Sequence, residues 1–234
     1  MNRYREIDVL RGIAITLMLF LHTLWCLDYL GFNIDMSAYV IQPIVPSLFL
    51  VIAGISLYLS FSKNTDYKHW MKVSVYRSIK LIILGFAITV ISLFLFPNMP
   101  VISGILTCIG ISLLVGIAFI RLSVNTLVIS NLLLIPAGFF ISHTSIGNNY
   151  LFYLIGFKTT IQSLDYFPVV PWLWCMVFGI TIGKLWYTNG IRQFRIPKSL
   201  NVKQLEWLGK HSLVIYLMHQ PILYCLLLSI KNML

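Results

Sequence analysis

The first apolar stretch of the sequence carries residue types that can do chemistry inside a membrane. Arg11 and His22 stand eleven positions apart in an otherwise apolar run. Eleven helical residues make three turns plus about 20°, so both side chains share one face, roughly 16 Å apart along the axis. Guanidinium is permanently charged and suits phosphate, whereas imidazole titrates near neutral pH and is a common general base. This face predicts an anion-binding residue near one membrane surface and acid–base chemistry deeper inside.

Three interpretations of His22 remain open from sequence. The ring bonds a neighbouring helix and has only a structural role. Alternatively, it is a general base that takes a proton from a hydroxyl or amine as that group attacks an activated acyl donor. The third interpretation is a covalent acyl-imidazole intermediate.

His219 and Asp165 are two further ionisable residues in or beside apolar runs, where such groups are costly and suggest function. Pro221 frees a backbone carbonyl near His219, so this histidine either satisfies a kinked helix or lines the same cavity as His22. Asp165 stands just before an apolar run that begins near residue 167. It either caps that helix or faces an external acceptor.

Composition predicts an integral membrane protein. The 234 residues are 59% hydrophobic and 10% charged, with a mean hydropathy of +0.87, whereas soluble domains carry about a quarter charged residues. We expect one transmembrane domain over residues 1–234, in the cell membrane. Every cysteine falls in an apolar run, which favours buried side chains over disulfides or a metal site: Cys26, Cys108, Cys175 and Cys225.

The apolar runs predict an all-α, polytopic helix bundle with about seven transmembrane helices, since each span needs about 20 residues. The expected spans are 9–30, 41–61, 76–96, 101–120, 123–142, 167–187 and 211–231. Between residues 143 and 166 the apolar piece 150–156 is too short to cross, and we expect a re-entrant or interfacial segment. Glycines inside the spans are expected to allow close helix packing: Gly85, Gly104, Gly110, Gly116, Gly179 and Gly183.

The basic residues fall almost entirely on one side of these spans. Of the 17 Lys and Arg residues, all but Lys158 and Lys231 lie in the loops that share a side with the N-terminus. The positive-inside rule places that side in the cytoplasm. The net charge of +10 therefore reflects membrane orientation and contact with anionic lipids, and does not indicate nucleic-acid binding.

Some of these cations have a second candidate role, which is to bind an anionic cytosolic ligand. The predicted loop 62–80 is the best place for it, because several basic residues are close together there. The candidate binding residues for that ligand are Arg5, Arg11, Lys72, Arg77 and Lys80.

Several motifs together resemble the transmembrane acyltransferase superfamily. The stretch Ile7-Asp-Val-Leu-Arg-Gly-Ile-Ala14 followed by His22 is similar to its opening. Arg11, ten residues and then His22 match the arginine–ten–histidine motif of the acyltransferase-3 branch. The other blocks resemble small prokaryotic members of the branch with the heparan-α-glucosaminide N-acetyltransferase catalytic domain. These blocks are Pro46–Ser56, Ser103–Gly110, Asp165–Trp172 and Leu208–Pro221.

This resemblance implies a membrane acyltransferase that uses cytosolic acetyl-CoA or another acyl-CoA. The acyl group would pass to an extracytoplasmic acceptor, namely a glycan, a lipid head group or an amine. Arg11 would help to place the CoA phosphates, and His22 would serve the transfer. Related enzymes also suggest a homodimer. Two other classes of protein stay open: a small solute or lipid transporter with His22 and His219 as proton-relay groups, and a non-catalytic binding or scaffold protein on the same fold.

Overall fold

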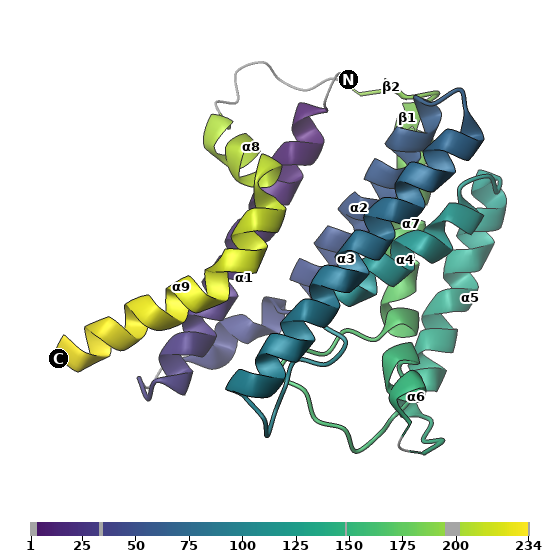
Figure 1. Cartoon of the computed structure of the whole chain (residues 1–234). Coiled ribbons are helices and arrows are strands. Elements are labelled where there is room, and N and C mark those ends of the chain that lie inside the picture. Colours follow the sequence, from purple (N-terminus) through teal and green to yellow (C-terminus); the bar gives the residue numbers. More distant parts are fainter. Residues whose placement is uncertain (1–3, 33–34, 148, 195–201, 234) are drawn as a thin grey trace. The chain divides into compact units, whose positions relative to one another are not determined.

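The computed structural model describes residues 4–32, 35–147, 149–194 and 202–233. Arg3, Arg195 and Lys198, three of the predicted cytoplasmic cations, lie outside the described residues. The elements in chain order are α1 (Arg5–Tyr29), the 3-10 helix η1 (Met36–Ile41), α2 (Ile44–Ser62), α3 (Tyr67–Leu95), α4 (Ile105–Phe119), α5 (Val124–His143), α6 (Tyr150–Ile155), α7 (Val169–Trp186), β1 (Tyr187–Thr188), β2 (Ile191–Arg192), α8 (Lys203–Lys210) and α9 (Ser212–Met233) (Figure 1).

The chain is divided into two compact units. Unit 1 comprises Met1–Phe49 and Pro197–Leu234, and unit 2 comprises Leu50–Ile196. Within the described residues the strands are confined to the two-residue pair β1 and β2, which is antiparallel. The predicted all-α class is therefore confirmed.

Among the described residues, six helices are long and apolar enough to cross a membrane. They are Arg5–Tyr29, Tyr39–Ser62, Tyr67–Leu95, Val124–His143, Val169–Trp186 and Ser212–Lys231. The helix predicted at 101–120 is also present, but α4 has only 15 residues. At 1.5 Å per residue α4 is about 22 Å long, which is less than the roughly 30 Å of a bilayer core.

The residues before α4 explain its short length. Residues 100–104 are not helical, and their backbone bonds to residues 163–167 instead. The N–H of Ile102 donates to Ser163 Oγ at 2.7 Å, and the N–H of Phe167 donates to the carbonyl of Ser103 at 2.9 Å. Ser103 is only 1% exposed. Irregular backbone at membrane depth needs such partners, because lipid offers none.

Unit 2 is a packed group of helices in which α3 contacts α4, α4 contacts α7, and α5 contacts α7. Glycines allow the closest approaches, as predicted for most of them. A Cβ on Gly179 of α7 would overlap the carbonyl of Val51 in α2, and one on Gly110 of α4 would stand 3.0 Å from the carbonyl of Ser78 in α3. Gly104 is an exception to the prediction, because it is the N-cap of α4 and lies outside the helix.

Unit 1 is built around α1, which packs against α8 and α9. Gly12 and Gly209 bring α1 and α8 into backbone contact, since a Cβ on Gly12 would overlap the carbonyl of Leu205 and one on Gly209 that of Asp8. Further along α1, Ile15, Met18 and Leu21 form a buried cluster with Val45. Helix α8 lies in a stretch that was predicted to be part of a basic loop.

Three local expectations change. The predicted loop 62–80 is mostly helix, because Asp66 caps α3 by accepting hydrogen bonds from the N–H groups of Lys68 and His69. The apolar piece predicted near 150–156 is the short helix α6. Three of the four cysteines are buried as expected, whereas Cys225 is exposed on α9.

Candidate active site

His22 and His219 lie side by side in unit 1. Helix α1 runs without a break from Arg5 to Tyr29, so Arg11 and His22 do share one helix. His219 is on α9, and its ring lies edge-on to that of His22 with centroids 4.7 Å apart. His219 is 8% exposed, and His22 is partly buried. His22 and His219 thus form one pair.

The two nitrogens of His219 have different surroundings. Nδ1 is 2.5 Å from the backbone carbonyl of Tyr216. Nε2 is buried and has no hydrogen-bond partner among the described residues. The carbonyl that loses its helical donor at Pro221 is that of Leu217, four residues earlier, whereas His219 contacts that of Tyr216. The interpretation that His219 compensates for Pro221 is therefore not supported by this contact.

Polar contacts continue along the seam between α1 and α9. The side-chain N–H of Gln220 points at Cys26 Sγ at 3.6 Å, one helical turn beyond His22. Its Oε1 is buried and without a partner among the described residues. Lys231 Nζ then donates to the carbonyl of Leu30 at 2.6 Å, which satisfies the end of α1.

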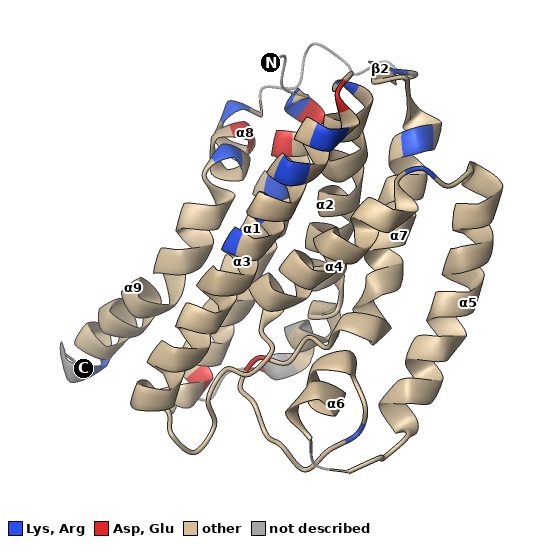
Figure 2. Ribbon diagram, turned by 45° about the vertical axis from the view of Figure 1, so that its right-hand side comes forward, with Lys and Arg blue, Asp and Glu red and all other residues tan. Residues whose placement is uncertain are grey.

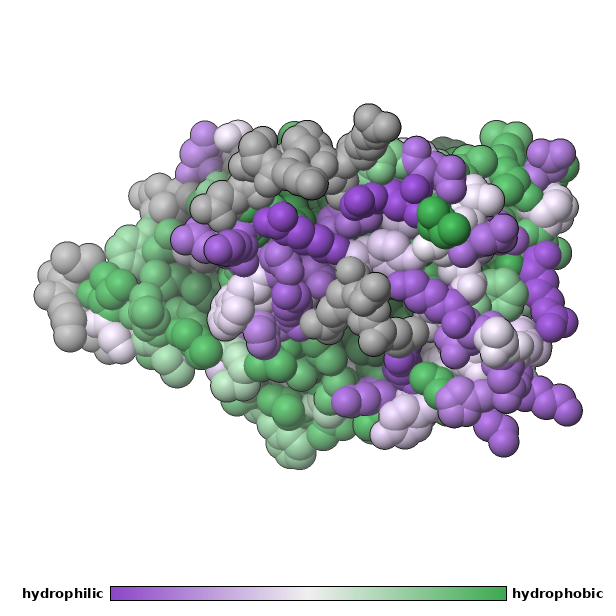
Figure 3. Space-filling view, turned by 90° about the horizontal axis from the view of Figure 1, so that it is seen from above, coloured by the Kyte–Doolittle hydropathy of each residue, from purple (hydrophilic) through white to green (hydrophobic). Residues whose placement is uncertain are grey.

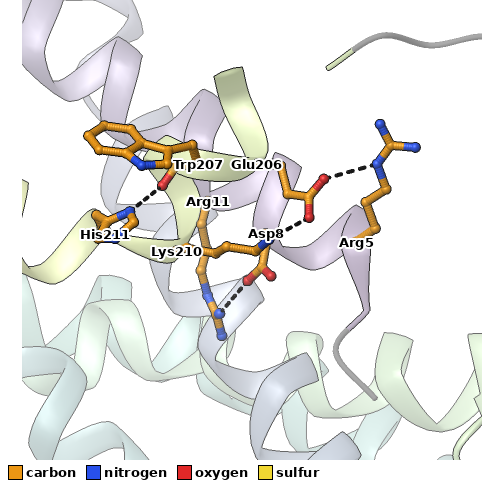
Figure 4. Close-up of polar contacts among 7 residues, drawn as sticks. All are labelled: Arg5, Asp8, Arg11, Glu206, Trp207, Lys210 and His211. Carbon is orange, nitrogen blue, oxygen red and sulfur yellow. Dashed lines mark hydrogen bonds and ion pairs between the residues drawn. The ribbon is translucent and has the colours of Figure 1, made fainter. Parts of the chain in front are cut away.

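The charged start of α1 is paired internally. Arg11 Nη1 is 3.2 Å from Asp8 Oδ1, and the Asp8 side chain is only 3% exposed against 30% for Arg11. Arg5 Nε is 3.1 Å from Glu206 Oε2, and Lys210 Nζ is 2.6 Å from Glu206 Oε1 (Figure 4). The Lys210 ammonium and the Arg5 guanidinium hold the pKa of Glu206 below its ordinary value. Arg5 and Arg11 are therefore engaged by acids, which reduces their charge available to an anionic ligand.

The cations predicted in loop 62–80 lie on helix α3 instead. Lys72, Arg77 and Lys80 are exposed and extend from the second turn of α3 toward its middle. Lys and Arg residues gather at the end of unit 2 where α3 begins and α7 ends (Figure 2). The same end of unit 2, seen from above, is largely hydrophilic (Figure 3).

Asp165 belongs to unit 2 and serves the start of another helix. Its carboxylate accepts a hydrogen bond from the backbone N–H of Ile105, the first residue of α4. Burial raises the pKa of this carboxyl to about 6. The predicted cap of the helix that follows Asp165 is not formed, because α7 has Pro168 as its N-cap and Asp165 bonds the start of α4 instead. Asp165 lies in unit 2, whereas His22 and His219 lie in unit 1.

A cavity of about 580 Å³ opens in unit 2 near α6. No motif in the sequence predicted a cavity at this place. Tyr153 and Tyr166 stack in its wall with centroids 4.1 Å apart. The Tyr166 hydroxyl donates to the carbonyl of Tyr153 at 2.7 Å. Lys158 and Gln162 are its exposed polar lining residues. These residues come from separate segments that only the fold brings together.

The described part of the chain holds no group of three His, Cys, Asp or Glu side chains placed to bind a metal ion.

Comparison with protein families gives one match. Residues 3–221 match the family model described as "Heparan-alpha-glucosaminide N-acetyltransferase, catalytic". This range includes both histidines, the charged start of α1 and Asp165. Searches of curated proteins and of solved structures found no match.

Proposed function

The chain belongs to the heparan-alpha-glucosaminide N-acetyltransferase catalytic family, and on this basis we propose that it is an acyl-CoA-dependent acyltransferase of the cell membrane. It takes an acetyl or related acyl group from the cytoplasmic side and passes it to an acceptor at the outer side. The observation that carries this proposal is the pair His22 and His219, which lies between apolar helices within the matched range.

His22 is the general base of the proposed reaction. It removes the proton from the acceptor hydroxyl or amine as that group attacks the thioester carbonyl. The bond from the carbonyl carbon to sulfur then breaks, and the CoA thiolate takes a proton from the imidazolium. The products are the acylated acceptor and CoA thiol, so His22 returns to its neutral form.

Charge distribution supports the direction of transfer. Lys72, Arg77 and Lys80 are exposed on α3 and are the first candidates to hold the phosphates of acyl-CoA. Arg11 and Arg5 have a secondary place in this proposal, because each is held by an acid. The positive-inside rule puts all these residues in the cytoplasm. The exposed apolar side chains of α3, α5 and α9 suit membrane lipids, and the family relationship supports a homodimer.

Acetyl-CoA binding and acetyl transfer test the proposal directly. The detergent-solubilised protein should show a higher melting temperature with acetyl-CoA, because a ligand that binds only the folded state stabilises it. His22→Ala should keep this shift and lose acetyl transfer, measured as CoA thiol release with a panel of glycan, lipid and amine acceptors. His143→Ala is the matched control, since His143 is exposed at the end of α5.

Two results would contradict the proposal. One is the absence of any thermal shift with CoA or acetyl-CoA, which would favour a scaffold protein. The other is solute flux into liposomes without an acyl donor, abolished by His22→Ala, which would favour a transporter.

A further inference from the structure

The surroundings of His219 fix where its proton lies. A backbone carbonyl can only accept a hydrogen bond, so the 2.5 Å contact with the carbonyl of Tyr216 requires the proton on Nδ1. Neutral imidazole carries one such proton, and Nε2 is then a lone-pair acceptor. The backbone carbonyl of Tyr216 thus selects one tautomer of His219.

Nε2 of His219 needs a donor. It is buried and unpartnered among the described residues, and a buried acceptor without a partner is costly. One N–H of the Gln220 amide points at Cys26 Sγ. The ring of His22 is the nearer of the two rings that contact His219, with centroids 4.7 Å apart against 5.4 Å for the ring of Tyr216, and its N–H is the candidate donor to Nε2.

We infer that His219 is the positioning residue for His22: its Nε2 accepts a hydrogen bond from one ring nitrogen of His22 and leaves the other nitrogen free as a base. The inference deepens the proposed function and rests on it for its catalytic consequence. The tautomer relationship between the two rings rests only on the contacts described above.

This arrangement has a defined role during transfer. The free nitrogen of His22 takes the proton of the acceptor, and the imidazolium keeps its other N–H on Nε2 of His219. A hydrogen bond from a charged donor is stronger than a neutral one, so His219 stabilises the charged intermediate state without giving up its own proton. When the CoA thiolate takes a proton from the free nitrogen of His22, the pair returns to its starting state.

Nitrogen NMR of protein labelled with ¹⁵N-histidine tests the tautomers without any substrate. Spectra are recorded in detergent at pH 8, and the two residues are assigned from His22→Asn and His219→Asn. We expect His219 to be protonated at Nδ1 and the tautomer equilibrium of His22 to shift in His219→Asn. Protonation of His219 at Nε2, or an unchanged His22 spectrum in the variant, would overturn the inference.

Two substitutions separate positioning from folding. In His219→Asn the amide replaces the Nδ1–H donor to Tyr216 but lacks an acceptor at the Nε2 position. In His219→Gln the longer amide supplies an oxygen there. We expect kcat to fall at least tenfold in His219→Asn, with the KM for acetyl-CoA within twofold of wild type, and to recover at least threefold in His219→Gln.

A purely structural His219 would give a different result. Both variants would then lose activity in proportion to the fall in their melting temperatures, and His219→Gln would show no recovery of kcat. The two proposals also fail separately: absence of transfer in the wild-type protein contradicts the acyltransferase, whereas the NMR result decides the relationship between His219 and His22.

Discussion

The backbone of Asp8 in α1 touches Gly209 in α8, so that a Cβ on Gly209 would overlap the carbonyl oxygen of Asp8 and stand 3.0 Å from the backbone nitrogen of Gly12. Both obstacles are backbone atoms, which cannot rotate away as a side chain can. The contact fixes α8 against the charged start of α1, next to the ion pairs of Arg5 and Arg11.

Gly209→Ala should therefore destabilise the protein. An exposed helical glycine usually gains about 0.5–1 kcal/mol on change to alanine, but the overlap here should reverse the sign and cost about 1–3 kcal/mol. The measurement is the melting temperature in detergent. Gln204→Ala, at an exposed position of the same helix, is the control and should leave the melting temperature nearly unchanged. Equal melting temperatures for Gly209→Ala and the wild type would contradict the close packing.

Arg11 should contribute to stability through Asp8. Removing one partner of a buried ion pair leaves the other charge uncompensated, at a cost on the order of 3 kcal/mol. Arg11→Gln should thus lower the melting temperature more than the double variant Arg11→Gln/Asp8→Asn, in which neither charge is left. Arg77→Gln removes an exposed cation of α3 and controls for net charge. Additive effects of the two changes would show that the pair is not coupled.

Asp165→Asn should stabilise the protein increasingly as the pH rises. Burial raises the pKa of Asp165 from its ordinary 3.8 to about 6, so the folded state binds this proton more tightly than the unfolded chain. The resulting stability is fully present below about pH 3.8 and is lost as the pH rises through 6. At pH 8 the asparagine, whose oxygen can still accept from Ile105, should gain on the order of 2 kcal/mol.

The check is the melting temperature of Asp165→Asn against wild type at pH 5 and pH 8. The gain should be clearly larger at pH 8. Asp35→Asn is the matched control, because hydrogen bonds from the Ser37 N–H and hydroxyl lower the pKa of the exposed Asp35. That variant should gain nothing at pH 8. An equal gain in melting temperature for Asp165→Asn at both pH values would rule out a buried carboxyl with a raised pKa.

Hydropathy and spacing predicted most of the helices. The spans at 9–30, 41–61 and 123–142 correspond to α1, α2 and α5 within a few residues, because each is a continuous apolar run with polar ends. The ion pair of Asp8 and Arg11 is also local, three residues apart on one helix, where neighbouring side chains meet.

Features that depend on distant segments were not predictable in this way. The short length of α4 is caused by residues 163–167, which bond the backbone of residues 100–104. Helix α8 depends on its glycine contact with α1, since eight residues are too few to form a stable helix alone. The contact of His22 with His219 likewise arises only when α1 and α9 pack, although each residue stood out alone as an ionisable group in an apolar run.

Labelling of Lys158→Cys and Lys68→Cys should show whether α4 and the irregular segment before it complete a membrane crossing. Between residues 68 and 158 the chain forms α3, α4 and α5, together with the six-residue helix α6, which is too short to cross. Three crossings would therefore place the two residues on opposite sides. Both lysines are exposed.

The changes are made on a Cys225→Ser background, because Cys225 is exposed while the other three cysteines are buried. A membrane-impermeant maleimide should label Lys158→Cys in intact cells and Lys68→Cys only after permeabilisation. Labelling of both from the same side would mean that α4 does not complete a crossing, and labelling of Lys68→Cys alone in intact cells would invert the orientation predicted from the basic residues.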